Sequence, residues 1–349
     1  MQITGIKIRN FKAFQDFELT DITPLTVFIG RNGTGKSTLF EVFWFLKMCL
    51  ESNSKPAFDK LGGYKNVISK GHEDENIRIE LEFDTDYSYV AEFTASLTVR
   101  EFLNHRSPFL EQEIKSPIKW DNHLSVKIIH PSSYPEQIPV VEAIRRFSFS
   151  DFDDNSIKGI PLAYDVTTDV SPDGANLMVV AHNLYEKHPD RFKIIVERMK
   201  RHIPGISDIE MKKTEDERVI MKINDGAFKD AILSKYASDG TMRLFAYLCM
   251  FANPSPPSLL CVEEPERQIA NDIMPYFAEY LYEYSENGQI FVASHSAEML
   301  NYINLEDAVI LTKKDGFATA SHLKDNPDVV EAIEYGDKLG RMWNQGFFD

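Results

Sequence analysis

A glycine-rich segment near the start of the chain has the spacing of a phosphate-binding loop. Residues 30–37 read Gly-Arg-Asn-Gly-Thr-Gly-Lys-Ser, a full match to the pattern GxxxxGK[S/T]. Glycines let the backbone wrap closely, so that its N–H groups point at phosphate oxygens. We expect Lys36 to contact the β- and γ-phosphates of a nucleoside triphosphate and the Ser37 hydroxyl to hold Mg²⁺. The residues expected at the nucleotide here are Gly30, Asn32, Gly33, Gly35, Lys36, Ser37 and Thr38.

A second group of candidate residues follows a short apolar segment late in the chain. Residues 258–262 are predicted to form a buried strand, and Glu-Glu-Pro-Glu comes directly after them. A strand that ends in acids suits a Mg²⁺-bound nucleotide, with Glu263 holding the metal and Glu264 polarising the attacking water. The alternatives are a solvated acidic loop and the carboxylate centre of a nuclease, which would need further acids.

A third group, Ser294-His295-Ser296, follows the apolar segment 289–293. A histidine at the carboxyl end of a strand lies where open α/β sheets bind ligands, so we expect His295 to reach a γ-phosphate. A Ser-His hydrolase triad is disfavoured, because adjacent strand residues point to opposite faces and the sequence has no GxSxG elbow. A purely structural histidine remains the alternative.

A fourth group, Ser238-Asp239-Gly240, precedes a predicted helix. Alone it is an ordinary helix N-cap, because Ser and Asp side chains accept hydrogen bonds from the first backbone N–H groups of a helix. Its position shortly before the acidic strand makes it a further candidate for the nucleotide site.

The elements that must position these residues are predicted from apolar patterning. Strands are expected at residues 3–11, 25–29, 77–83, 87–99, 125–129, 206–211, 219–223, 258–262 and 289–293. Helices are expected at 37–50, 140–147, 174–186, 189–202, 241–252 and 269–285, and a loop at 51–76. The alternation at both ends predicts an α/β fold with one discontinuous domain, residues 1–130 and 206–349, and a mainly helical insertion, residues 131–205.

The composition limits the classes of protein that the chain can be. Its 349 residues include 38 Lys and Arg against 54 Asp and Glu, and the resulting charge of −16 argues against coating nucleic acid through bulk charge. The acidic runs 73–75 and 151–154 are expected to be plain surface. The three cysteines form no CxxC pair, which argues against a disulfide framework or a cysteine zinc site. No apolar run is long enough for a membrane span or a signal peptide, so we expect a cytoplasmic protein without a membrane partner.

The order of these motifs resembles the ABC-type ATPase head of the RecF/SMC/OLD-like group, AAA-type ATPases of bacterial defence and repair. The opening segment 6–14, the segment 173–177 and the closing Gly-Arg-Met-Trp at 340–343 are also similar to members of that group. The resemblance implies a P-loop NTPase head with a mixed central sheet flanked by helices, ATP and Mg²⁺ as cofactors, and hydrolysis of ATP to ADP and phosphate.

The resemblance also implies how the motifs cooperate. Ser238, Asp239 and Gly240 take the place of the signature loop, which closes on the γ-phosphate of ATP held by a second subunit. Two ATPs are thus enclosed in a head-to-head homodimer. His295 takes the place of the switch histidine, and Glu264 takes the catalytic place.

The chain departs from this group at several points. Arg267-Gln268-Ile269 stands where many relatives have a Gly-Leu-His-Pro-like turn, Glu263 replaces a commoner Asp, and Gln137 is the candidate for the Q-loop. We therefore expect slow turnover. Too few residues follow His295 for the Toprim nuclease domain of OLD-type members, and the insertion lacks the heptads and CxxC of coiled-coil arms with a zinc hook. Any cleavage is therefore expected to belong to a partner.

The predicted helix 189–202 is the candidate contact for DNA. It carries the cations Arg191, Lys193, Arg198, Lys200 and Arg201. They form either a solvated helix face or a contact to the phosphate backbone. Two functions remain open. One is an ATP-hydrolysing switch in anti-phage defence or DNA repair that controls a separate effector. The other is an ATP-loaded scaffold or sensor that assembles and restrains a partner nuclease or toxin with little turnover.

Overall fold

The computed structural model describes the chain except for residues 86, 107–112, 122–137, 163–166 and 349. The predicted strand 125–129 and the Q-loop candidate Gln137 lie outside the described residues.

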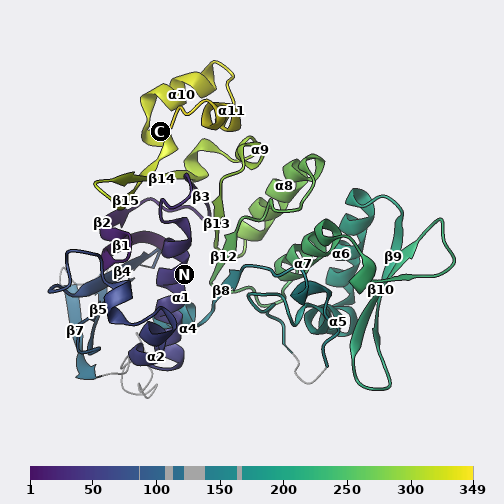
Figure 1. Cartoon of the computed structure of the whole chain (residues 1–349), viewed down its shortest axis with the longest axis horizontal. Helices are drawn as coiled ribbons and strands as arrows, with labels where there is room; N and C mark the ends of the chain where they lie inside the picture. The colour runs from purple at the N-terminus through teal and green to yellow at the C-terminus, as the bar shows by residue number, and fades with distance from the viewer. Residues whose placement is uncertain (86, 107–112, 122–137, 163–166, 349) are drawn as a thin grey trace. The chain divides into compact units, whose positions relative to one another are not determined.

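The described chain forms two compact units (Figure 1). Unit one contains residues 1–147, 257–261 and 288–349, and unit two contains residues 148–256 and 262–287. Unit two therefore includes segments that the sequence analysis assigns to the head, and the predicted division at 130 and 206 stays a prediction.

A mixed sheet carries the predicted nucleotide loop. Its strand order is β15-β14-β3-β13-β12-β8 within the described residues. The bounds are β3 Leu25–Ile29, β8 Phe147–Ser150, β12 Leu259–Glu263, β13 Ile290–Ser294, β14 Ala308–Lys314 and β15 Phe317–His322. β3 pairs in parallel with β13 and β14, whereas β14 and β15 are antiparallel. Every residue of β3 and β13 is buried, as expected for parallel strands covered on both faces. The boundaries of the two units pass through β8 and β12.

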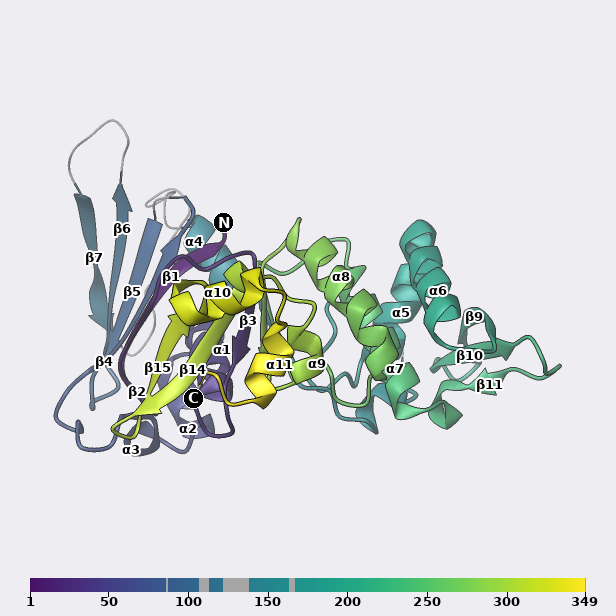
Figure 2. The same ribbon diagram turned by 90° about the horizontal axis from the view of Figure 1, so that it is seen from above.

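A second sheet of unit one is antiparallel, in the order β2-β1-β4-β5-β6-β7. The bounds are β1 Ile3–Phe11, β2 Phe14–Leu19, β4 Ile77–Phe83, β5 Tyr87–Phe93, β6 Val99–Arg106 and β7 Glu113–Asp121. Figure 2 shows β4, β5, β6 and β7 side by side in one layer. Burial alternates along β4, which explains why its period-two pattern is readable in the sequence.

The helix α1, Lys36–Glu51, packs against both sheets of unit one. Its Phe45 ring lies 4.9 Å from Phe93 of β5, and its Phe43 ring lies 5.6 Å from Phe291 of β13. A helix that is apolar on most of its faces is stable only when it is buried, and α1 is held in this way at the heart of unit one. Its first residue is therefore fixed relative to β3.

The structure corrects three expectations in unit one. The predicted loop 51–76 contains α2, Ser54–Lys60, and α3, Tyr64–Val67, because Asn53 caps α2 and Phe58 is buried under α1. The predicted strand 87–99 is two strands, since the chain reverses at Leu97, whose φ is +61°. The helix predicted at 140–147 is displaced toward the N-terminus, since α4 spans Ile138–Arg145 and β8 begins at Phe147.

The last part of unit one contains elements that the sequence pattern does not predict. After α9, Ala297–Leu300, the β14–β15 hairpin leads to α10, Pro327–Glu334, and α11, Leu339–Asn344. Both views show α11 beside α9 (Figures 1 and 2).

In its described residues, unit two combines the helices α5 to α8 with a small antiparallel sheet of order β11-β10-β9. The bounds are α5 Leu177–Lys187, α6 Pro189–His202, α7 Asp239–Phe251, α8 Met274–Ser285, β9 Ile206–Lys213, β10 Val219–Asp225 and β11 Ile232–Leu233. α6 matches its prediction, because its apolar stripe has a clear helical period. α8 begins later than predicted, after a 3₁₀ turn at Asn271–Ile273. Across the described residues, none of the helices has the length and apolar character needed to cross a membrane.

Candidate nucleotide site

The predicted phosphate loop connects β3 directly to α1. Gly30 is buried beside β14, and a Cβ there would lie 2.5 Å from the Leu311 carbonyl oxygen. The loop can follow this path only with glycine at its first position, because any side chain would meet neighbouring backbone. The Thr34 hydroxyl donates to the Arg31 carbonyl at 2.9 Å and closes the turn. The backbone thus has the close-wrapped form that a phosphate cradle requires.

Two side chains of the loop have the chemistry that ATP and Mg²⁺ need. The Lys36 ammonium group donates to the carbonyls of Gly30 at 2.6 Å and Arg31 at 3.2 Å, so its charge lies along the loop. Ser37 is exposed in the first turn of α1, where the positive end of the helix favours anions. These residues fit a bound triphosphate, with the serine hydroxyl as one oxygen ligand for Mg²⁺.

His295 lies beside this loop because of the strand register. In the parallel β3–β13 pair, Ser294 is opposite Ile29, so His295 lies level with Gly30. His295 is exposed, whereas Ser294 is buried and its hydroxyl accepts from the Ser296 backbone N–H at 3.0 Å. Ser296 in turn caps α9. Unit one therefore brings together the phosphate loop and His295, which the sequence presents more than 250 residues apart.

The acidic motif has an unusual backbone. Glu263 is the last residue of β12 and is half-buried. Glu264, also half-buried, has φ +42°, and Gln268 has φ +63°. Non-glycine residues held at positive φ are uncommon and are concentrated at functional sites. The Arg267 side chain lies 3.9 Å from the Glu264 carboxylate. Glu263 and Glu264 belong to unit two and the phosphate loop to unit one, so a shared Mg²⁺ stays a prediction.

The predicted signature loop lies at the start of α7. The Ser238 side chain accepts a hydrogen bond from the Thr241 backbone N–H at 3.1 Å, so this serine is the N-cap, as the pattern indicates. Ser238 and Asp239 are exposed, and Asp239 forms an ion pair with Lys158. A Cβ on Gly240 would lie 2.3 Å from the Gln268 carbonyl oxygen. The signature loop is thus in direct contact with the loop that follows Glu264.

An ionic network that the sequence pattern does not predict supports this contact. Asp154 accepts from Arg243 of α7 at 2.7 Å and from Gln268 at 2.6 Å. Partial burial acts to raise the pKa of Asp154, but the hydrogen bonds from Arg243 and Gln268 and the charge of Arg243 lower it overall. The expectation that 151–154 is plain surface is therefore wrong for Asp154. The signal in the sequence is that Arg243 is the single cation in the otherwise mostly apolar segment 241–251, and the structure buries it in α7.

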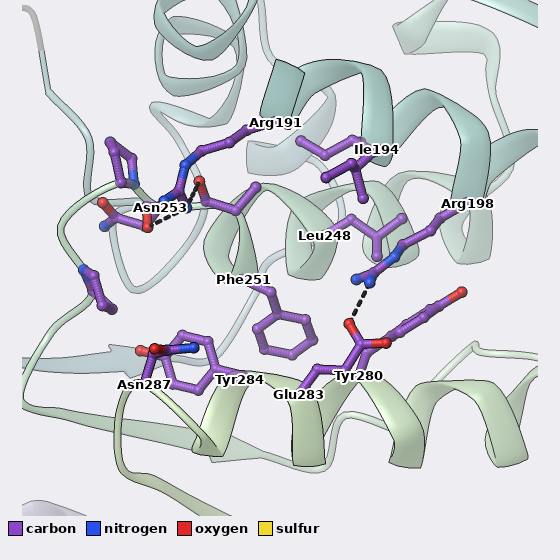
Figure 3. A pocket seen from close by; sticks show the side chains of 14 residues that line it. Arg191, Ile194, Arg198, Leu248, Phe251, Asn253, Tyr280, Glu283, Tyr284 and Asn287 are labelled. Atoms are coloured by element: carbon purple, nitrogen blue, oxygen red, sulfur yellow. Dashed lines mark hydrogen bonds and ion pairs between the residues drawn. The ribbon is translucent and has the colours of Figure 1, made fainter. Parts of the chain in front are cut away.

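The predicted DNA contacts on α6 fall into two classes. Figure 3 shows Arg191 and Arg198 pointing into a cavity of about 670 Å³ between α6, α7 and α8. Arg191 donates to the carbonyls of Ala252 at 3.2 Å and Asn253 at 3.1 Å. Arg198 pairs with Glu283 and lies 4.0 Å from the centre of the Tyr280 ring. These arginines hold helices together.

The other three cations are not among the residues that line this cavity. Lys200 is 3.9 Å from Asp208 of β9. Lys193 and Arg201 are exposed. A phosphate-backbone contact by α6 would therefore depend mainly on these two residues.

Comparison with known proteins agrees with the fold. A family model described as "AAA domain, putative AbiEii toxin, Type IV TA system" matches residues 25–301. The DNA double-strand break repair Rad50 ATPase of Pyrococcus abyssi is 28% identical over 143 residues, which are 40% of this chain and 14% of that protein. The matched segment is thus a small part of that relative.

Solved structures of SMC heads have the same fold. An SMC head bound to the C-winged helix domain of ScpA matches with a TM-score of 0.62 and 16% identity, covering 92% of this chain and 97% of that one. The SMC head of Thermotoga maritima matches with a TM-score of 0.55 and 15% identity, covering 92% and 99%. The predicted P-loop ATPase fold with a mixed central sheet is confirmed.

Proposed function

Because the chain belongs to the AAA-domain family that its residues 25–301 match, a family of ABC-type ATPases with AbiEii-like members, we propose that it binds and hydrolyses ATP as a molecular switch. The switch dimerises around ATP in the cytoplasm and controls a separate effector in anti-phage defence or DNA repair. The observation that carries the proposal is the position of His295 level with the first residue of the phosphate loop.

The proposed chemistry divides among the residues of the predicted motifs. The loop amides and Lys36 bind the phosphates, and Ser37 and Glu263 would hold Mg²⁺. The metal ion, when bound, neutralises negative charge on the β- and γ-phosphates. Glu264 orients a water molecule and accepts its proton as the water oxygen bonds to the γ-phosphorus and the bond to ADP breaks. His295 donates a hydrogen bond to a γ-phosphate oxygen.

Dimerisation is proposed from the exposure of the signature loop. Ser238 and Asp239 are exposed at the N-terminus of α7, where the helix dipole favours a negative phosphate. A second copy can therefore present this loop to ATP held by the first. Closure would exclude bulk water, which strengthens every electrostatic contact to the γ-phosphate.

The biological setting is proposed from the related proteins. The family description names a toxin of a type IV toxin–antitoxin system, and the Pyrococcus relative is described as a DNA repair ATPase. One of the SMC heads is bound to a domain of ScpA, so heads of this fold can engage partner proteins. We infer a separate nuclease or toxin as the effector here, with the nucleotide state setting the contact.

The replacement Glu264→Gln tests the proposal. It removes the carboxylate that accepts the proton while keeping the side-chain shape, so we expect ATP turnover to fall about 100- to 1000-fold. ATP affinity should stay within about twofold, because the phosphate contacts are kept. Turnover is measured by phosphate release, and dimerisation by light scattering with and without ATP. The variant should accumulate as an ATP-bound dimer.

The matched control is Glu279→Gln, the same chemical change at an exposed position of α8. It should hydrolyse ATP like the parent. Equal turnover in the parent and Glu264→Gln would contradict the role of Glu264. A parent that binds ATP and dimerises without releasing phosphate would instead favour the scaffold or sensor.

A further inference from the structure

The C-terminal helix α11 packs directly on the loop that carries His295. The Trp343 indole N–H donates to the His295 carbonyl oxygen at 3.3 Å. The Gly340 backbone N–H donates to the Asn301 side-chain oxygen at 3.1 Å, just after α9. Two residues of α11 thus hold the two ends of the short segment from His295 to Asn301.

The approach of α11 to α9 is as close as backbones allow. A Cβ on Gly340 would lie 1.7 Å from the Ala297 carbonyl oxygen, so this position admits only glycine without a shift of backbone. Met342 is buried on the same helix, and the Trp343 ring stacks on Phe348 with centroids 6.2 Å apart. The Gly-Arg-Met-Trp segment at 340–343 therefore packs α11 against α9 and the His295 loop.

The contact from α11 adds to the hydrogen bonds that the His295 loop makes within itself, where Ser296 bonds to Ser294 and caps α9. β13 ends at Ser294, and α9 has only four residues. A short helix is marginally stable by itself and depends on tertiary packing. The His295 side chain acts on a γ-phosphate only if the loop keeps it level with Gly30, and small displacements of catalytic groups are costly.

We propose that Trp343 is a positioning residue for His295: α11 fixes the His295 carbonyl through the indole N–H and thereby holds the imidazole toward the γ-phosphate. The inference rests on the proposed ATPase function, because His295 has this task only there. It assigns the C-terminal helix to the nucleotide site of unit one, although no residue of that helix belongs to the P-loop, acidic or signature motifs.

The replacement Trp343→Phe tests this role. Phenylalanine keeps an aromatic ring against Phe348 and loses the N–H donor, so the loss is that of one neutral hydrogen bond. We expect kcat for ATP hydrolysis to fall about fivefold, while the Kd for ATP stays unchanged. The neighbouring exposed Asn344→Ala is the matched control and should behave like the parent.

A double-mutant cycle separates positioning from general support of the fold. If Trp343 acts through His295, Trp343→Phe should have no further effect on kcat in a His295→Ala background. Additive losses would overturn the inference. Hydrogen exchange of the peptide 295–301 gives a second readout that needs no hydrolysis, and it should be faster in Trp343→Phe than in Asn344→Ala.

The outcomes for the two proposals are distinct. If the parent releases no phosphate from ATP, the proposed hydrolysis fails. The positioning role of Trp343 is then decided by hydrogen exchange, and an unchanged exchange rate of the peptide 295–301 in Trp343→Phe would overturn it. If the parent hydrolyses ATP and Trp343→Phe matches it in kcat, the inference alone fails.

Discussion

The two halves of the predicted ATPase machinery are held in place by different forces. In unit one, the phosphate loop and the start of the His295 loop are fixed by backbone, through the β3–β13 register and the contact of Gly30 with Leu311. In unit two, Gly240 of the signature loop also meets a backbone carbonyl, that of Gln268, but charged side chains hold the loop as well, through the Lys158–Asp239 ion pair and the bridge from Asp154 to Arg243.

The two kinds of contact differ in how strongly pH and salt affect the position of each half. Backbone pairing inside a buried parallel sheet is insensitive to pH and salt, whereas partly exposed ion pairs weaken at high salt and in acid that protonates the carboxylate. The nucleotide is thus expected to meet a rigid cradle in unit one, while the signature loop of unit two can be adjusted. This suits a switch in which ATP binds first and closure of the dimer follows.

Lys36→Ala tests the phosphate loop of unit one, and its effect on ATP binding is expected to be the largest. It removes the ammonium group that compensates the phosphate charge, so we expect ATP affinity to fall more than about 100-fold. Binding is measured by calorimetry or with a fluorescent ATP analogue. Lys47→Ala, on the same helix, should keep parental affinity. Retained ATP binding in Lys36→Ala would show that the cradle does not work as described.

Asp154→Asn would loosen the adjustable half with a smaller effect. It leaves the guanidinium of Arg243, which is 4% exposed, without its anionic partner, so we expect a loss of about 1–3 kcal/mol in the free energy of unfolding. ATP affinity should be unchanged and turnover reduced several-fold, because the signature loop rests on this network. Asp151→Asn, an exposed neighbour, is the control. A loss of ATP affinity in Asp154→Asn as large as that in Lys36→Ala would contradict the separation of the two halves.

The same network predicts a pH dependence. The pKa of Asp154 is lowered in the folded state from its ordinary value of 3.8. Its contribution to stability is therefore fully present above that value and is lost as the pH falls through the lower folded pKa. The difference in melting temperature between the parent and Asp154→Asn should be constant near neutrality and should shrink in acid. A difference that grows in acid would contradict this assignment.

DNA binding offers the smallest effect and also belongs to unit two. Replacing Lys193 and Arg201 with alanine should weaken DNA binding several-fold and reduce the slope of log affinity against log salt by about 2, since two phosphate contacts are lost. Arg198→Ala is the comparison, because its guanidinium is already paired with Glu283. It should lower stability more than DNA affinity. A parent without DNA binding at low salt would remove this interaction.

The chemistry-bearing motifs could be read from the sequence because they are local. The GxxxxGK[S/T] spacing, the acids after an apolar strand and the histidine after the next strand need only short windows of residues. Most strands and helices were predicted for the same reason, since burial imposes a period of 2 or 3.6 on neighbouring side chains. The loop predicted at 51–76 was wrong because its polar composition hid the buried Phe58.

Tertiary structure alone decided which distant groups support those motifs. Trp343 lies 48 residues from the carbonyl it contacts, and Arg243 lies 89 residues from Asp154. Such contacts leave no periodic signal, because they depend on how completed elements pack. For the same reason the cations of α6 looked alike in the sequence, whereas Arg198 faces a helix and Lys193 faces solvent. The sequence by itself determined what chemistry the chain carries, and the packing of its elements decided which residues hold that chemistry in position.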